Sequence, residues 1–327
     1  MKRRQLIALG AAACIWPLGV LAQQSSRLPR LCVLTLDAQS SSWAPRYAAF
    51  IQGLSDLGYV DGQSILIDVV SAAGKYDRFP ELAPECLRLK PEIIVAYTTP
   101  GAIAAKNATN TIPIIFGPIG DPVGTGIVAS FARSGGNITG QTLMAPEIST
   151  KRLQLLKETI PTLTRVAVLS YLTDPIARLQ IQEMERAAKP LGLHLQIHNI
   201  KTTDDLPTAF EAATKAGAQG LMTTIETFLI GRGTRIAELA IKHGIPAMYP
   251  VRDFVDAGGL MSYGPNSLAL YRRTSTQVDK VLKGTKPADI PVEQPAKFEF
   301  IVSLRAAKAL GLTIPPATLA RADELIE

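Results

Sequence analysis

The sequence has few residues of the kinds that hold metals or activate nucleophiles. Its 327 residues include three His and three Cys. His194 and His198 are four apart, but their segment alternates like a strand, which would place both on its solvent-facing side. Neither a Gly-x-Ser-x-Gly elbow nor a Gly-Lys-Thr phosphate loop occurs. We therefore expect no metal site, no cofactor and no catalytic site of these kinds.

Charge of one sign is not concentrated in any part of the sequence. Lys and Arg number 34 against 28 Asp and Glu, a formal net charge of +6, and the basic residues are scattered among the acidic ones. A nucleic-acid-binding surface needs basic side chains gathered on one face. The composition therefore argues against nucleic acid as a partner.

The apolar run at the N-terminus is too short and too interrupted to cross a bilayer, which takes about 20 residues. It follows Lys2, Arg3 and Arg4 and ends in a small-residue pattern at Ala22. This arrangement is typical of a secretory signal peptide. We predict that residues 1–22 are removed near Ala22 on export to the periplasm. The remaining 327 − 22 = 305 residues are enough for two domains.

Two alternatives concern the same segment. Arg3 and Arg4 also fit a twin-arginine signal, so the export route stays open. Cys14 is a candidate lipid acceptor, but no Leu stands three places before it and the apolar run continues past it. We therefore do not expect a lipoprotein. Beyond the signal, Cys32 lies in an apolar run and Cys86 on a helix-like stretch, and we interpret both as buried thiols that an oxidising compartment would allow to pair.

The rest of the chain alternates between strand-like and helix-like segments, twice over. The first half gives RLCVLTL, SILIDVV, EIIVAY and IPIIFG as strands, with helices at 47–57, 78–89 and 101–108. The second half gives RVAVLSY, LHLQIHNI, GLMTTI and IPAMYP, with helices at 176–191, 205–215 and 233–242. This order predicts an α/β fold of two similar lobes, each a parallel sheet flanked by helices.

The stretches TIPIIFGPIGDPVGTG and GIPAMYPVRDFVDAGG, which begin at Thr111 and Gly244, have the same place in the two halves. Ligands of open parallel sheets bind beyond the carboxyl ends of the strands, so two facing lobes would form a cleft lined by such loops. The side chains that we expect in this cleft are Ser42, Trp43, Tyr97, Thr98, Thr99, Asp121, Tyr171, Asp174, Glu226, Thr227, Tyr249, Arg252, Asp253 and Tyr263.

Several of these residues also have a purely structural interpretation. Asp121 and Asp174 each precede Pro and could cap the turn or helix that follows. Tyr97 and Tyr249 stand at strand ends and could only cover the sheet. Arg252 could pair with Asp253 or Glu226. These alternatives are left open by the sequence.

The charges in the cleft suggest the chemistry of a ligand. Thr98 and Thr99 begin a helix whose first turn contains Pro100, where free backbone N–H groups and the helix dipole suit a carboxylate. Acidic groups outnumber Arg252 elsewhere in the cleft, and Asp121 in particular could hold an amine. The hypothesis is an amino-acid-like zwitterion with a hydrophobic or aromatic side chain, and the alternative is a simple carboxylate.

Blocks along the whole chain resemble the ABC transporter substrate-binding proteins of the tryptophan and tyrosine type. They include AAFIQGLSDLGYVDGQSILID, KYDRFPELA, TIPIIFGPIGDPVGTGIVASFARSGGNITG, KRLQLLKETIP, DFVDAGGLMSYG and KFEFIVSLRAAKALGLTIPPATLARADELIE. The resemblance implies a type I periplasmic-binding-protein fold with crossovers near 140–142, 263–266 and 286–290. The N-terminal lobe would then be 28–140 plus about 265–286, and the C-terminal lobe 142–263 plus about 290–327.

The resemblance also implies a monomeric periplasmic receptor, without enzymatic activity, that hands a small molecule to a membrane permease. DAQSSSW and PVRDF depart from the usual family pattern at the cleft, so the identity of the ligand is not carried over. A sensor domain that signals to a membrane partner without transport remains an alternative. A two-thiol racemase is disfavoured, because the second half contains no Cys.

Overall fold

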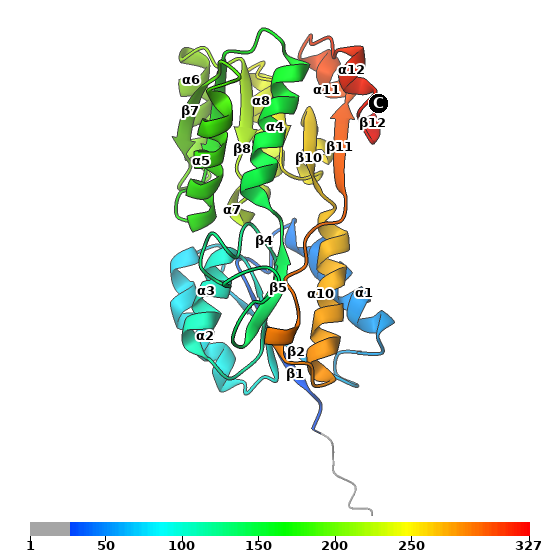
Figure 1. The fold of residues 1–327 in the computed structure, drawn as a ribbon. Helices are drawn as coiled ribbons and strands as arrows, with labels where there is room; N and C mark the ends of the chain where they lie inside the picture. The colour runs from blue at the N-terminus through cyan, green and yellow to red at the C-terminus, as the bar shows by residue number, and fades with distance from the viewer. Residues whose placement is uncertain (1–26) are drawn as a thin grey trace, which may run out of the picture.

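The computed structural model describes residues 27–327, and they form two α/β lobes stacked end to end (Figure 1). The predicted signal peptide, with its Arg pair and Cys14, lies outside the described residues. Each lobe has a sheet with helices on both of its faces, so the predicted fold class is confirmed.

The sheet of the first lobe has five parallel strands in the order β2-β1-β3-β4-β5. Its strands are β1 (Arg30–Thr35), β2 (Leu66–Ser71), β3 (Ile93–Tyr97), β4 (Ile114–Ile119) and β5 (Ile138–Thr142). Its helices are α1 (Trp43–Asp56), the 3-10 turn η1 (Tyr76–Arg78), α2 (Phe79–Arg88), α3 (Thr99–Ala108), α10 (Ser267–Leu282) and the 3-10 turn η2 (Pro287–Asp289). Every residue of β3 and β4 is buried, as expected for central strands covered on both faces.

The sheet of the second lobe has seven strands in the order β12-β11-β10-β9-β8-β6-β7, with β11 antiparallel to β10. They are β6 (Arg165–Ser170), β7 (His194–Asn199), β8 (Gly220–Thr223), β9 (Ala247–Tyr249), β10 (Met261–Pro265), β11 (Phe298–Ser303) and β12 (Glu324–Ile326). The helices are α4 (Ala145–Thr159), α5 (Pro175–Ala188), α6 (Asp205–Lys215), α7 (Thr227–Ile230), α8 (Gly233–Lys242), α9 (Asp253–Asp256), α11 (Leu304–Ala309) and α12 (Pro316–Leu319).

The chain passes between the lobes three times. The first passage follows β5, at the left-handed residue Met144 (φ 51°), and the second lies at Asn266, between β10 and α10. The third lies after Glu293, later than the predicted 286–290. The reason is that Thr139 donates to the carbonyl of Ile290, and the Glu293 amide donates to that of Gly140, which hold this segment against β5.

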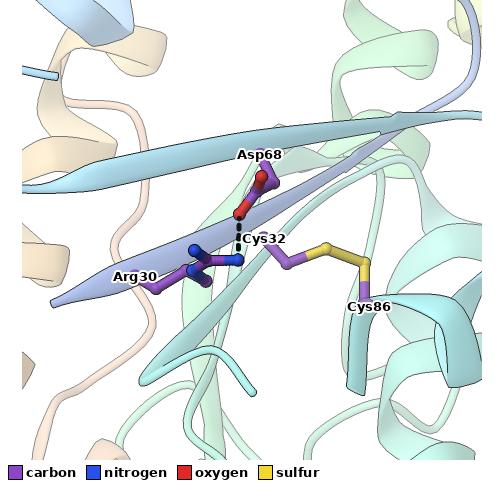
Figure 2. Close-up of a disulfide and its surroundings, with 4 residues drawn as sticks. All are labelled: Arg30, Cys32, Asp68 and Cys86. Atoms are coloured by element: carbon purple, nitrogen blue, oxygen red, sulfur yellow. Dashed lines mark ion pairs between the residues drawn. A yellow bond between two sulfur atoms is a disulfide. The ribbon is translucent and has the colours of Figure 1, made fainter. Parts of the chain in front are cut away.

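Cys32 and Cys86 form a disulfide between β1 and α2 (Figure 2), so of the two possibilities, buried free thiols and a pair, the pair is found. Helix α2 packs on the face of β1 that carries Cys32, and the two Cα atoms are 5.7 Å apart. This packing decides the pairing, and it is not visible in the local sequence. Beside the disulfide, Arg30 and Asp68 join β1 to β2 through an ion pair of 3.4 Å.

Candidate functional site: the interlobe cavity

A small cavity lies where the carboxyl ends of the two sheets face each other. Its volume is about 40 Å³, room for about three water molecules. Isoleucines of the second lobe form much of its apolar lining, among them Ile176, Ile225 and Ile230. Its polar lining is Arg46, Thr98, Thr99, Asp174, Thr227 and Ser267. Four of these, Thr98, Thr99, Asp174 and Thr227, were predicted from the sequence, and the cavity brings them together from both lobes.

The first-lobe wall is formed by the start of α3. Thr98 caps this helix, since its hydroxyl accepts from the Gly101 amide at 3.0 Å. The backbone of Thr98 has φ 153° and ψ 153°, a region that side chains other than glycine rarely adopt, at a cost of about 1–3 kcal/mol. With Gly101 satisfied and Pro100 lacking an N–H, Thr99 is left to offer its amide and hydroxyl to the cavity. Thr99 is only 3% exposed and lines the cavity.

The second-lobe wall carries Asp174, which caps α5. Its Oδ1 accepts from the Ile176 amide at 3.2 Å, so the capping alternative holds as well as the cleft position. Only 3% of Asp174 is exposed, and this burial raises the pKa of its carboxyl to about 7. A carboxyl with this pKa can change its charge near neutral pH when a cation arrives.

Glu226 lies behind this wall in a buried polar cluster. Burial, and then the nearby Asp174, raise its pKa to about 8. Its two carboxyl oxygens accept from the Thr224 hydroxyl at 2.6 Å and from the Gln180 side-chain amide at 3.3 Å. Glu226 does not itself line the cavity; its chain neighbours Ile225 and Thr227 do.

The same cluster contains Arg152 of α4, which the sequence analysis missed. Burial lowers the pKa of Arg152 to about 10, although the Glu226 carboxyl acts in the opposite direction. Its Nη2 donates to the Ser149 hydroxyl at 3.2 Å. Its Nε and Nη1 are enclosed and have no partner among the described residues. Arg152 sits in the second turn of an amphipathic helix, where its sequence context resembles that of an exposed residue.

Arg46 of α1 is the second basic residue that the sequence analysis missed. Its Nη1 donates to the Ser42 carbonyl at 2.6 Å and to Oδ1 of Asp253 at 2.7 Å. Because Asp253 begins α9, this ion pair joins the two lobes. Burial lowers the pKa of Arg46, but the Asp253 carboxylate outweighs this effect and the pKa is raised overall. Asp253 thus pairs with Arg46, and the Ser42 hydroxyl lies 3.2 Å from that of Ser40.

The aromatic residues that were predicted in the cleft do not line the cavity, and most of their rings pack inside the lobes. Tyr97 stacks on Tyr271 with centroids 4.6 Å apart, and Trp43 meets Tyr97 edge-on at 5.4 Å. Tyr249 is fully buried and stacks on Phe254. The sheet-covering alternative therefore describes Tyr97 and Tyr249.

The two remaining tyrosines behave differently from each other. Tyr171 stacks on Phe228 at 4.2 Å and meets Tyr76 of the first lobe at 5.1 Å, so it belongs to an aromatic contact between the lobes. Tyr263 packs on Phe298, on the β10–β11 pair, and does not line the cavity.

Asp121 and Arg252 are also absent from the cavity wall. Oδ1 of Asp121 accepts from the Val123 and Gly124 amides at 3.0 and 2.9 Å, and this turn uses the carboxylate as a cap. Arg252 is half-exposed and pairs with Asp256 at 3.1 Å and with Glu324 at 2.6 Å. Arg252 therefore forms ion pairs, as the structural interpretation proposed, but not with the expected Asp253 or Glu226.

None of the helices within residues 27–327 is long and apolar enough to span a membrane. The same residues contain no cluster of three or more His, Cys, Asp or Glu side chains that could bind a metal ion.

Comparison with known proteins places the fold. The chain superposes on a conserved domain protein from Vibrio cholerae with a TM-score of 0.85 at 23% identity, covering 91% of this chain and 100% of that one. A Streptococcus pneumonia ABC domain in complex with L-Trp gives a TM-score of 0.83 at 24% identity, covering 92% and 100%.

Sequence comparison agrees with the fold. A tyrosine-binding protein of Clostridioides difficile (strain R20291) is 27% identical over 263 residues, which are 80% of this chain and 75% of the relative. A sequence model for the ABC transporter substrate binding protein family matches residues 39–326. The chain therefore belongs to the family of ABC transporter substrate-binding proteins.

Proposed function

We propose that the protein is an exported receptor that captures an amino-acid-like zwitterion between its lobes and delivers it to the permease of an ABC transporter. The observation that carries this proposal is the polarity of the cavity. On one wall, Thr98 and Thr99 present the positive end of α3, and on the other wall Asp174 presents a buried carboxyl group. A carboxylate suits the first wall and an ammonium suits the second.

Asp174 takes the role that the sequence analysis gave to Asp121. Both are capping residues, but only Asp174 lines the cavity. Its low exposure makes a charge-assisted hydrogen bond with an ammonium strong, because water does not compete for it. One similar protein is in complex with L-Trp and another is named a tyrosine-binding protein, and both ligands are compatible with this polarity.

The cavity volume of about 40 Å³ is far below the roughly 300–1,000 Å³ of ordinary ligand pockets. An amino acid with a large side chain therefore does not fit in it as it stands. We infer that the lobes separate to admit the ligand and then close on it by rotation about the three connecting segments. Tyr171 and Tyr76, which touch across the lobes, then become two aromatic surfaces that could cover an apolar side chain.

Export to the periplasm is supported by the Cys32–Cys86 disulfide, since disulfides persist in oxidising compartments. Among the described residues, Asp174 is the one carboxyl group that lines the cavity, and binding an ammonium accounts for it; the raised pKa of Glu226 follows from its burial and from the nearby Asp174. We therefore propose no catalytic turnover. A sensing role without transport uses the same site and differs only in the membrane partner.

A thermal-shift screen of the mature chain with the common L-amino acids tests the proposal. A ligand at about 100 times its dissociation constant should stabilise the folded state by about 2.7 kcal/mol. The expected result is a rise in melting temperature with at least one amino acid that has an unmodified amine and carboxylate. If only simple carboxylates stabilise the protein, the carboxylate-binding alternative is correct and the zwitterion proposal fails.

A further inference from the structure

Arg46 is the one basic side chain on the cavity lining in the described part of the chain. It lies in the first turns of α1, with its guanidinium carbon 6.0 Å from the centre of the Tyr271 ring. The residue is only 6% exposed. An arginine so deeply buried beside a ligand site needs a partner for each of its N–H groups.

The two terminal nitrogens of Arg46 are occupied very unequally. Nη1 already has two acceptors, the Ser42 carbonyl and the Asp253 carboxylate. Nη2 is enclosed and has no acceptor within residues 27–327. A guanidinium offers a planar fork that suits a carboxylate, so a free Nη2 beside the cavity points to an anionic group of the ligand.

A second observation on the same wall points to the same kind of group. The helix α3 has ten residues, and its positive N-terminal end, with Thr98 and Thr99, borders the same cavity. Among the described residues of the first lobe, no carboxyl group lines the cavity to neutralise this end. The cation and the helix end therefore favour one anion between them.

We propose that Arg46 is the residue that recognises the carboxylate of the ligand and couples that recognition to closure of the lobes. Nη2 is assigned to the ligand carboxylate, and Nη1 keeps its ion pair with Asp253 of the second lobe. This inference rests on the receptor function proposed above. It predicts that a ligand whose carboxylate is converted to an amide leaves Nη2 unpaired and binds poorly, even when its amine and side chain are unchanged.

The alternative is that Arg46 only joins the lobes through its ion pair with Asp253, here called the latch, and does not contact the ligand. The two roles are separable, because Asp253→Asn removes the charge of the latch and leaves the guanidinium in place. Arg46→Gln removes both roles. Arg252→Gln is the matched control, since Arg252 is adjacent to Asp253 in sequence but pairs with Asp256 and Glu324 away from the cavity.

The experiment is isothermal titration of the wild type and the three variants with L-tryptophan and L-tryptophanamide, or with the acid and amide of whichever amino acid gives the largest thermal shift. The wild type and Arg252→Gln should bind the acid at least tenfold more tightly than the amide. Arg46→Gln should bring this ratio close to one. Asp253→Asn should weaken both ligands and keep most of the ratio.

The inference is overturned if Arg46→Gln keeps the acid-to-amide ratio, or if Asp253→Asn abolishes it as completely as Arg46→Gln does. Folding of each variant is checked by circular dichroism, and Arg46→Lys replaces Arg46→Gln if the latter does not fold; it should lower the ratio, because an ammonium lacks the fork. If the wild type binds acid and amide equally, the role of Arg46 is refuted, but the proposed receptor function is not. A wild type that binds no amino acid refutes the proposed function, and the role of Arg46 with it.

Discussion

The two lobes repeat one strand and loop, and they use the aspartate of that loop in different ways. In the first lobe, Asp121 turns back on its own loop and accepts from two amides, and Gly124 allows this approach because any Cβ there would lie 2.2 Å from the carboxylate. In the second lobe, Asp253 begins α9 and reaches across to Arg46. The loop of the first lobe thus stabilises itself, whereas the loop of the second lobe binds the other lobe.

The difference shows that a duplicated pattern predicts where the backbone lies but not which way a side chain points. Because the two aspartates have different partners, substitutions in the two lobes should also have different effects. Changes at Asp121 should affect folding of the first lobe, and changes at Asp174 or Asp253 should affect ligand binding and closure. The Cys32–Cys86 disulfide between β1 and α2 is a further difference between the lobes, because the second lobe has no cysteine.

The largest effect, on stability, is expected from removing this disulfide. Replacing Cys32 and Cys86 together by Ala should lower the free energy of unfolding of the first lobe by about 4 kcal/mol, since the bridge closes a loop of 54 residues. Trp43 is the only tryptophan after residue 22 and belongs to the first lobe, so its fluorescence in a urea titration reports this lobe alone. An unchanged midpoint in the double variant would show that the two lobes do not differ in this way.

A smaller effect, on binding, is expected from Asp174→Asn. Asn also caps helices well, so α5 should keep its start, while the charge-assisted contact with an ammonium is lost. Affinity for an amine ligand should fall by on the order of 2 kcal/mol in titration calorimetry. Asp121→Asn makes the same chemical change in the other lobe and serves as the control. Equal losses in both variants would erase the distinction between the two aspartates.

The pH dependence of binding follows from the raised pKa of Asp174, about 7. An ammonium needs the ionised carboxylate, so affinity should increase by about tenfold, or 1.4 kcal/mol, from pH 6 to pH 8. The stability of the unliganded protein should change in the opposite direction. Between the ordinary carboxyl pKa and about 7 to 8 the folded state holds more protons at Asp174 and Glu226 than the unfolded state, so stability decreases as pH rises. Binding that is independent of pH over this range would exclude Asp174 as the partner of the amine.

The smallest effect is expected from Asp121→Asn. Loss of the charge of this cap should lower the stability of the first lobe by about 1 kcal/mol or less, because Asn can still accept the two amide hydrogen bonds. Ligand affinity should be unchanged. Thermal unfolding and calorimetry of the same preparation check both statements, and a weakened affinity at unchanged stability would return Asp121 to the binding site.

Eight of the strands could be predicted, because they are apolar or alternating runs bounded by Gly or Pro, whereas β5, β10, β11 and β12 were not predicted from their local pattern. Gly58, for example, follows the helix predicted at 47–57 and has φ 87°, a conformation that favours glycine after a helix. Thr98, Thr99, Asp174 and Thr227 were found because they lie in the segments that follow β3, β6 and β8, where the topology alone places them near the cavity.

The missed residues depend on packing that no local pattern encodes. Arg46 enters the cavity only because α1 is rotated so that its first turns face Asp253, and a helix with Arg at this position would ordinarily expose it. Tyr97 was assigned to the cleft because it ends β3, but its ring turns into the lobe, where it stacks on Tyr271 of a helix about 170 residues later. Pairing of Cys32 with Cys86 likewise depends on how α2 sits on β1.

The most direct test of the polarised cavity is calorimetry of the wild-type mature chain with the best-binding amino acid and two analogues of it, one without the amine and one without the carboxylate. The first-lobe wall and the second-lobe wall should each reject the analogue that lacks its own partner group, so both analogues should bind at least tenfold more weakly than the amino acid. If either analogue binds as tightly as the parent compound, the wall assigned to the missing group does not recognise it, and the account of the site is wrong.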